Sequence, residues 1–81
     1  MNANYVLGLC ARLLRLALAE NFARITPAMV AIMNERRALL RALQVGIRNA
    51  AELSCVEAVS STVADTDRGL LVMMQSHAAT A

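Results

Sequence analysis

The sequence has no tryptophan and no lysine, only two aromatic side chains, Tyr5 and Phe22, and just one proline and three glycines. An all-β fold needs many turns, so this scarcity of glycine and proline argues against one. Without lysine, arginine is the only strongly basic residue. The net charge of +2 is too small to indicate nucleic-acid binding by itself.

The sequence also lacks the groups that catalysis requires. His77 is the only histidine, and no glycine-rich phosphate loop is present. Asp65 and Asp67 are the closest pair of carboxylates, but residues at i and i+2 point to different sides of a helix and cannot share a proton. We therefore expect no enzyme activity and no cofactor.

The two cysteines and the apolar N-terminal run do not indicate a metal site or a membrane span. Cys10 and Cys55 have neither metal-ligand nor Cys-X-X-Cys spacing, so we expect reduced, buried thiols and no metal. Arg12 and Arg15 interrupt the apolar stretch over 5–19, and a mid-span arginine costs about 2.5–3.5 kcal/mol. No basic segment precedes that stretch. A cytoplasmic protein without stable membrane insertion is expected.

The sequence is rich in small and aliphatic residues. Apolar residues make up 58% of the 81, mostly alanine, leucine, valine and methionine, which suit helix packing. This length predicts one domain over 1–81. So short a chain buries only about 60% of its unfolded surface, which leaves apolar surface in excess. The surplus predicts association with another copy or with a partner helix.

The clearest element is a helix over 27–45, on which we expect the rest of the chain to pack. Thr26 is suited to the N-cap, Pro27 to the first helical position, and Gly46 to a left-handed C-terminal cap. One face is apolar and comprises Met29, Ile32, Met33, Leu39, Leu40 and Leu43. Arg36 is the one charged residue on that face.

Two further helices are predicted. The first covers 3–21, with Asn2 or Asn4 as its cap, and its apolar arc is wider than one neighbour requires. The third covers 50–76, and Asn49 with Glu52 has capping-box spacing. The apolar residues of the first helix are Val6, Leu9, Leu13, Leu16 and Ala17 on one stripe, and Leu7, Leu14 and Leu18 on a second. Those of the third are Leu53, Val56, Val59, Val63, Leu70 and Met74.

The predicted fold class is therefore all-α, an antiparallel three-helix hairpin array or bundle. Residues 60–69 are poor helix formers, so we expect them to be helical through packing and to be bent or frayed. Phe22 and Ile25 are expected to fold back onto the first two helices. The tail over 77–81 is small and polar, and we expect it to be disordered.

The arginines of the second helix, and Arg48 just past its end, have two interpretations each. Arg36 needs either a carboxylate, with Asp65 and Asp67 as the candidates, or a partner that it contacts directly. Arg37, Arg41 and Arg48, here called the basic ridge, lie opposite the apolar face. They form either a solvated helix face or a nucleic-acid contact, although no aromatic platform for base stacking accompanies them.

Several motifs point to a known family. Phe22 and Ile25 place an aromatic and an aliphatic residue three apart in the first turn, the second helix carries NERRALLRAL, and the third carries ADTDRGLLVMM. Over residues 5–75 this resembles the flagellar export chaperone FliT family. Phe22 stands where the family usually has tryptophan, and the family has a fourth helix that regulates its binding surface.

The resemblance implies binding of an unassembled export substrate, such as the filament-cap protein, and of export-gate or transcription-factor partners. We predict a chaperone or adaptor that receives an amphipathic client helix through anchors at helical spacing. The predicted partner-binding residues are Met33, Arg36, Leu40, Val63, Leu70 and Met74. The alternatives are a helical-bundle dimer that binds nucleic acid or a transcription regulator, and a structural subunit without a client.

The surplus of apolar residues generates the first prediction. We expect the purified protein to be a dimer or larger at micromolar concentration, or poorly soluble alone, because one small domain cannot bury this much apolar surface. Light scattering measures the mass directly. A monomer that stays monodisperse for days contradicts the prediction.

Overall fold

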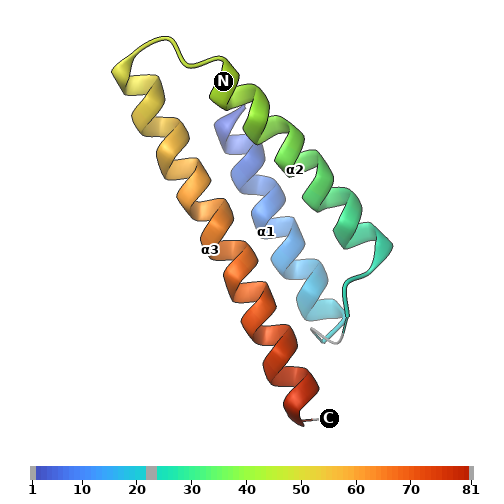
Figure 1. Cartoon of the computed structure of the whole chain (residues 1–81). Coiled ribbons are helices and arrows are strands. Elements are labelled where there is room, and N and C mark those ends of the chain that lie inside the picture. The colour runs from blue at the N-terminus through green and yellow to red at the C-terminus, as the bar shows by residue number, and fades with distance from the viewer. Residues whose placement is uncertain (1, 22–23, 81) are drawn as a thin grey trace.

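The computed structural model describes residues 2–21 and 24–80, and these contain three helices and no strand. The helices are α1 (Ala3–Ala19), α2 (Pro27–Val45) and α3 (Ala50–Thr80), which lie side by side (Figure 1). The all-α prediction is confirmed. The expected position of Phe22 lies outside the described residues.

The middle position in the array belongs to α1, not to α2. α1 packs extensively against both other helices, whereas α2 and α3 contact each other less (Figure 1). The expectation that the chain packs on the 27–45 helix is therefore wrong. The wide apolar arc of α1 explains the arrangement, because it buries residues toward two neighbours at once: Val6, Leu9, Cys10, Leu13 and Ala17.

The ends of α1 and α2 follow local chemistry, with one exception. The Met29 N–H donates to Thr26 Oγ1 at 3.2 Å, which confirms the predicted N-cap of α2. Gly46 has φ of −83°, so the predicted left-handed cap at this residue is wrong. The left-handed residue is instead Asn21, with φ of 56°, just after α1. Asparagine tolerates this conformation better than most residues.

The start of α3 confirms the Asn49 half of the predicted capping box, whereas the Glu52 half bonds one residue earlier than predicted. The Glu52 N–H donates to Asn49 Oδ1 at 2.9 Å. The Glu52 carboxylate in turn accepts from the Arg48 N–H at 2.8 Å, one residue before the N-cap. Two otherwise unpaired backbone donors at the helix start are thus satisfied by side chains.

The middle of α3 is helical, as predicted, and its C-terminal end is longer than predicted. Helix continues through 60–69, where the hydroxyls of Thr62 and Thr66 donate to the carbonyls of Ala58 and Thr62, at 3.1 and 2.9 Å. It also extends beyond Ser76, so residues 77–80 are helical where a disordered tail was expected. That segment contains no helix breaker and two alanines, the strongest helix former.

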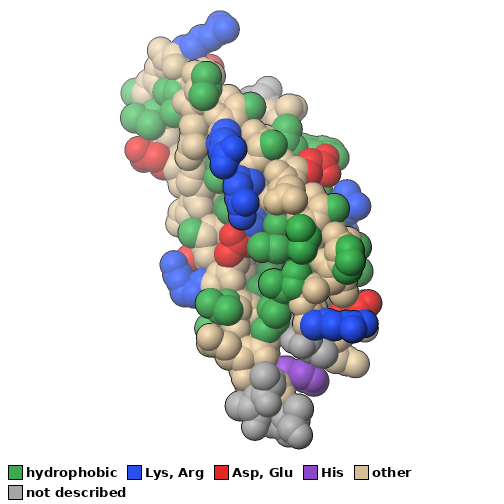
Figure 2. All heavy atoms as spheres, turned by 45° about the vertical axis from the view of Figure 1, so that its right-hand side comes forward, with side chains coloured by type: hydrophobic (Ala, Val, Ile, Leu, Met, Phe, Trp, Pro, Cys, Tyr) green, Lys and Arg blue, Asp and Glu red, His purple; other side chains and the backbone are tan. Residues whose placement is uncertain are grey.

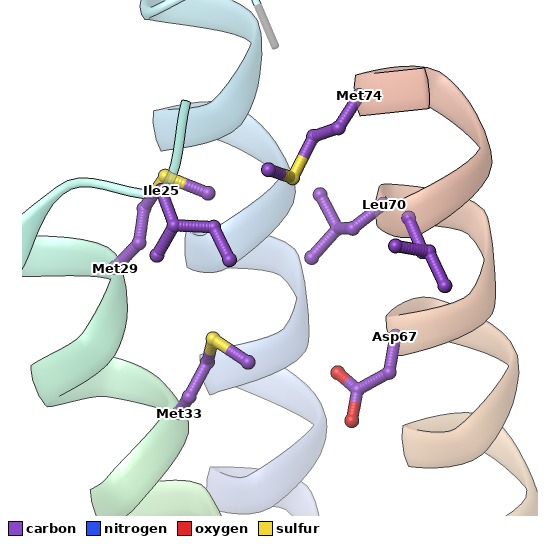
Figure 3. A pocket seen from close by; sticks show the side chains of 7 residues that line it. Ile25, Met29, Met33, Asp67, Leu70 and Met74 are labelled. Atoms are coloured by element: carbon purple, nitrogen blue, oxygen red, sulfur yellow. The ribbon is translucent and has the colours of Figure 1, made fainter. Parts of the chain in front are cut away.

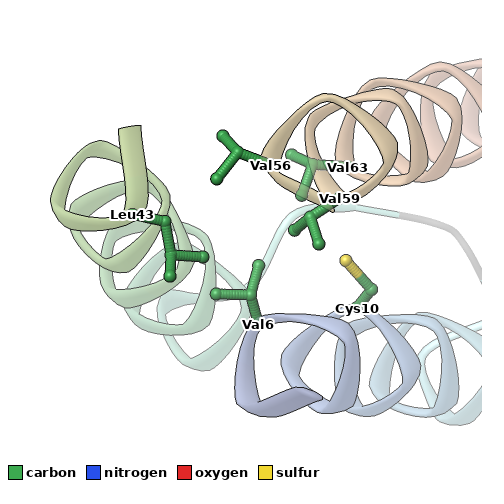
Figure 4. Close-up of a cluster of buried hydrophobic side chains, with 6 residues drawn as sticks. All are labelled: Val6, Cys10, Leu43, Val56, Val59 and Val63. Carbon is green, nitrogen blue, oxygen red and sulfur yellow. The ribbon is translucent and has the colours of Figure 1, made fainter. Parts of the chain in front are cut away.

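The buried residues that the structure describes form two core clusters, and each contains residues from all three helices. One comprises Val6, Cys10, Leu43, Val56, Val59 and Val63 (Figure 4). The other comprises Leu9, Leu13, Ala17, Met29, Ile32 and Leu70. Leu53, expected on the core side of the third helix, is instead 43% exposed, because it lies one turn before the first buried position of α3.

The array is long and thin, with extents of 48 × 19 × 15 Å. Its radius of gyration is 14.0 Å, whereas a compact chain of this length has about 12 Å. A thin array leaves each helix partly open to solvent. Among the described residues, ten large apolar side chains are accordingly exposed: Tyr5, Leu7, Leu18, Ile25, Val30, Val45, Leu53, Leu71, Val72 and Met73.

The central position of α1 generates a stability prediction. Leu13 is fully buried and Leu18, on the same helix, is 60% exposed. We expect Leu13→Ala to reduce the free energy of unfolding by about 2–5 kcal/mol, because it leaves a cavity against both neighbours. The control Leu18→Ala should change it by less than about 0.5 kcal/mol. Urea denaturation followed by circular dichroism measures both, and equal effects would contradict the central role of α1.

Candidate functional site

An apolar pocket of about 220 Å³ opens between α2 and α3 (Figure 3). It is lined by Ile25, Met29, Met33, Asp67, Leu70, Leu71 and Met74. The lining comes from three segments: the link before α2, the first half of α2, and the second half of α3. Asp67 is the one charged residue in this lining. The pocket therefore suits an apolar group with room for one polar contact.

The pocket has a buried floor and an exposed rim. Met29 and Leu70 belong to the core cluster and are only 1% and 4% exposed. Leu71 and Ile25 are exposed, and Met33 and Met74 are half-buried. Figure 3 shows the two methionines reaching toward the pocket from α2 and α3. Methionine side chains are unbranched and flexible, so this rim can adapt to partners of different shape.

A run of five apolar residues over 70–74 explains why α3 is exposed here. A run of this length points to all sides of a helix, and a helix that is apolar all round is normally buried. In this chain only Leu70 belongs to a buried cluster, while Leu71, Val72 and Met73 are exposed. The second half of α3 thus carries apolar surface that the other two helices do not cover.

The structure brings together three of the six predicted partner-binding residues. Met33, Leu70 and Met74 line the pocket. Leu40 is half-buried against the other core cluster, and Val63 is part of that cluster. The prediction did not include Ile25, Met29 and Leu71. The run over 70–74 was a usable signal for Leu71, since it exceeds what one buried face needs. Whether any of these residues binds a partner stays a prediction.

Arg36 lies inside the array, where it joins all three helices. It is 2% exposed. Its Nη2 forms an ion pair with Asp67 Oδ1 of α3, and its Nη1 donates to Cys10 Sγ of α1 at 3.8 Å. Arg36 Nε is buried without a hydrogen-bond partner among the described residues. Of the two interpretations from the sequence, the structural ion pair describes this side chain.

The choice between the two aspartates follows from their positions on α3. Asp65 is exposed and accepts from Arg68, one turn along the same helix, at 3.1 Å. The Asp67 side chain is 43% exposed, because it lies between Arg36 and the pocket. Asp67 therefore neutralises the buried charge of Arg36 and also forms part of the pocket wall.

A second polar contact ties α1 to α2 at the surface. The Tyr5 hydroxyl donates to Glu35 Oε1 at 2.9 Å. This hydrogen bond, together with the negative charge of Glu35, raises the pKa of Tyr5 above its usual value. Both side chains are exposed, so the contact orients the helices without burying charge.

The basic ridge is exposed, as the sequence predicts. Arg37 and Arg41 follow Met33 at four-residue steps, so they flank the apolar face of α2, and the expectation that they lie opposite it is wrong. Arg37, Arg41 and Arg48 all lie at the surface. Their side chains form no ion pair within the part of the chain that the structure describes. Figure 2 shows arginine side chains in a line that ends beside an apolar area on the same face.

A metal site requires several ligand side chains close together, and a membrane span requires a long apolar helix. Across residues 2–21 and 24–80, no three His, Cys, Asp or Glu side chains are grouped so that they could hold a metal ion. Over the same residues, no helix combines the length and the apolar character that crossing a bilayer requires.

The Arg36–Asp67 pair predicts that removing the aspartate destabilises the protein more than removing the arginine does. We expect Asp67→Ala to lower the free energy of unfolding by about 3 kcal/mol, because it leaves the Arg36 charge buried and unpaired. Arg36→Met should cost less than about 1 kcal/mol, since an apolar side chain of similar length removes the buried charge. The control Asp65→Ala breaks an exposed pair and should cost at most about 0.5 kcal/mol.

Denaturant unfolding of the three variants measures these differences. Equal losses for Asp67→Ala and Asp65→Ala would mean that the buried guanidinium does not depend on its α3 partner.

Comparison of the chain with protein-family models, with curated proteins and with solved structures finds no match. The resemblance to the export chaperones thus stays a prediction.

Proposed function

We propose that this protein is a small cytoplasmic chaperone or adaptor that binds an amphipathic helix of a type III-type export substrate, flagellar or injectisome, and keeps it unassembled. The observation that carries the proposal is the apolar pocket between α2 and α3, which is open to solvent and has a rim of methionine and leucine. The resemblance of residues 5–75 to the FliT family supports the assignment to export.

The pocket suits helix-in-groove recognition. An amphipathic helix inserts side chains spaced three and four residues apart into an apolar groove. Such a helix can lie over the pocket, between α2 and α3. Leu71 and Met74 then contact it from α3, and Met33 from α2. Burial of each such side chain is worth about 1.5–3 kcal/mol.

The client also accounts for the apolar surplus. Without a client, we propose that a second copy covers the exposed residues near the pocket, Ile25, Leu71 and Val72 among them, which makes the free protein a homo-oligomer. Client binding and self-association then compete for the same surface.

The second candidate function is binding of nucleic acid or of a transcription regulator. The observation that favours it is the exposed basic ridge of Arg37, Arg41 and Arg48. Phosphate contacts by arginine weaken steeply as salt rises, whereas apolar docking does not. A salt titration of any binding event therefore separates the two functions.

The test begins with the native client. Co-purification of the untagged protein from its own host, followed by mass spectrometry, should yield a flagellar or injectisome export substrate. Recovery of RNA or of a DNA-bound regulator in its place would favour the second function.

The pocket generates a binding prediction for that client. We expect Leu71→Ser combined with Met74→Ser to weaken binding by about two decades, because two apolar contacts are lost at the rim. Circular dichroism should show helicity close to that of the unchanged protein, since neither residue belongs to a buried cluster. Leu70 is left unchanged because it is part of the core.

The matched control is Val45→Ser combined with Leu53→Ser, which removes two exposed apolar residues away from the pocket. It should leave client affinity within about twofold of the unchanged protein. If the rim variant keeps both its helicity and its affinity, the pocket is not the client site.

A further inference from the structure

Two arginines of the basic ridge, Arg37 and Arg41, lie on α2 one and two helical turns beyond the pocket residue Met33. Met33, Arg37 and Arg41 are spaced four residues apart, so each lies about one helical turn beyond the last on neighbouring positions of the helix surface. Met33 lines the pocket and the two arginines are exposed. A partner helix that fills the pocket and extends along α2 therefore passes the arginines next.

The positive charge on this edge of α2 is not neutralised from within the described residues. Arg37 and Arg41 have no ion-pair partner there. The two aspartates of α3 are already engaged, since Asp67 pairs with Arg36 and Asp65 pairs with Arg68. This edge of α2 thus presents two unpaired guanidinium groups next to the apolar pocket.

We infer that the partner is an amphipathic helix with apolar anchors and with acidic residues one and two turns beyond them. This inference rests on the proposed function and adds the charge pattern of the client. Its anchors fill the pocket, and its carboxylates meet the guanidinium groups of Arg37 and Arg41, which can bind a carboxylate with two parallel hydrogen bonds.

Charge complementarity favours an acidic helix over a nucleic acid at this surface. A nucleic acid satisfies the arginines through phosphate but offers no aliphatic side chain for a pocket formed by leucine and methionine. Among the described residues only Tyr5 is aromatic, and it lies on α1 and is bonded to Glu35 of α2, so no stacking platform adjoins the ridge. One acidic amphipathic helix uses both parts of the surface.

The test uses the full-length protein and fluorescently labelled helical peptides. Each peptide carries leucine anchors at i, i+3, i+4 and i+7, followed by two positions, one and two turns further, that hold Glu, Gln or Lys. The variable pair is placed at either end of the anchors in separate peptides, so that both directions of docking are sampled. Fluorescence anisotropy gives the dissociation constants.

The glutamate peptide should bind about threefold to tenfold more tightly than the glutamine peptide in at least one direction, as expected for two exposed charge pairs. The lysine peptide should bind most weakly. In Arg37→Gln combined with Arg41→Gln, the glutamate advantage should disappear while the glutamine peptide binds unchanged. Raising the salt concentration should shrink the same advantage.

The matched control is Arg12→Gln combined with Arg15→Gln, which removes two exposed charges from α1. It should keep the full glutamate advantage. An equal loss in both double variants would show a general effect of net charge and would overturn the inference. Equal affinity for the glutamate and glutamine peptides would overturn it as well.

Two further outcomes separate this inference from the proposed function. In the first outcome, the peptides bind the unchanged protein and bind the Leu71→Ser, Met74→Ser variant more weakly, but the glutamate, glutamine and lysine peptides have equal affinity. This outcome overturns only the acidic pattern of the client. If no peptide binds, the proposed function itself is overturned. A labelled RNA or DNA oligonucleotide that binds through Arg37 and Arg41 would assign the ridge to nucleic acid and would also overturn the inference.

Discussion

A buried guanidinium is the constraint on which the rest of this small array depends. Taking the Arg36 charge out of water is costly unless an opposite charge comes with it, and Asp67 supplies that charge from α3. α2 and α3 contact each other less than either contacts α1, so this ion pair joins the two helices where apolar packing is weakest. Because Asp67 also lines the pocket, the pair positions the two pocket walls relative to each other.

The thin shape of the array explains why apolar surface stays exposed. α1 has neighbours on two sides and buries most of its apolar arc, whereas α2 and α3 lie at the outside. The apolar run over 70–74 lies on such an outer helix, and α1 covers only one of its faces (Figure 1). α3 therefore has more apolar surface than α1 and α2 cover, and a further helix packed on α3 would bury it.

The division of the pocket into floor and rim separates residues that stabilise the fold from residues that the proposed partner would contact. Met29 and Leu70 hold the helices together, so the pocket floor cannot change without loss of the fold. Leu71 and Met74 lie outside the buried clusters and can change with less effect on folding. The basic ridge adds charge at one end of this rim. A stable floor, an adaptable rim and a charged edge are the parts that selective binding of a helix requires.

The sequence by itself determined what depends on neighbouring residues: three helices, the Thr26 cap, the capping box of Asn49 and Glu52, and the placement of Arg36 on an apolar face. These features follow from hydrogen bonds and side-chain spacing within a few residues. Only the tertiary structure decided that α1 lies in the middle, that Asp67 and not Asp65 reaches Arg36, and that Met33 shares a pocket with Leu70 and Met74 while Leu40 and Val63 do not. Helical periodicity states which way a side chain points, but contact between helices depends on how far each is shifted along its axis, and that shift is set by the packing of all three together.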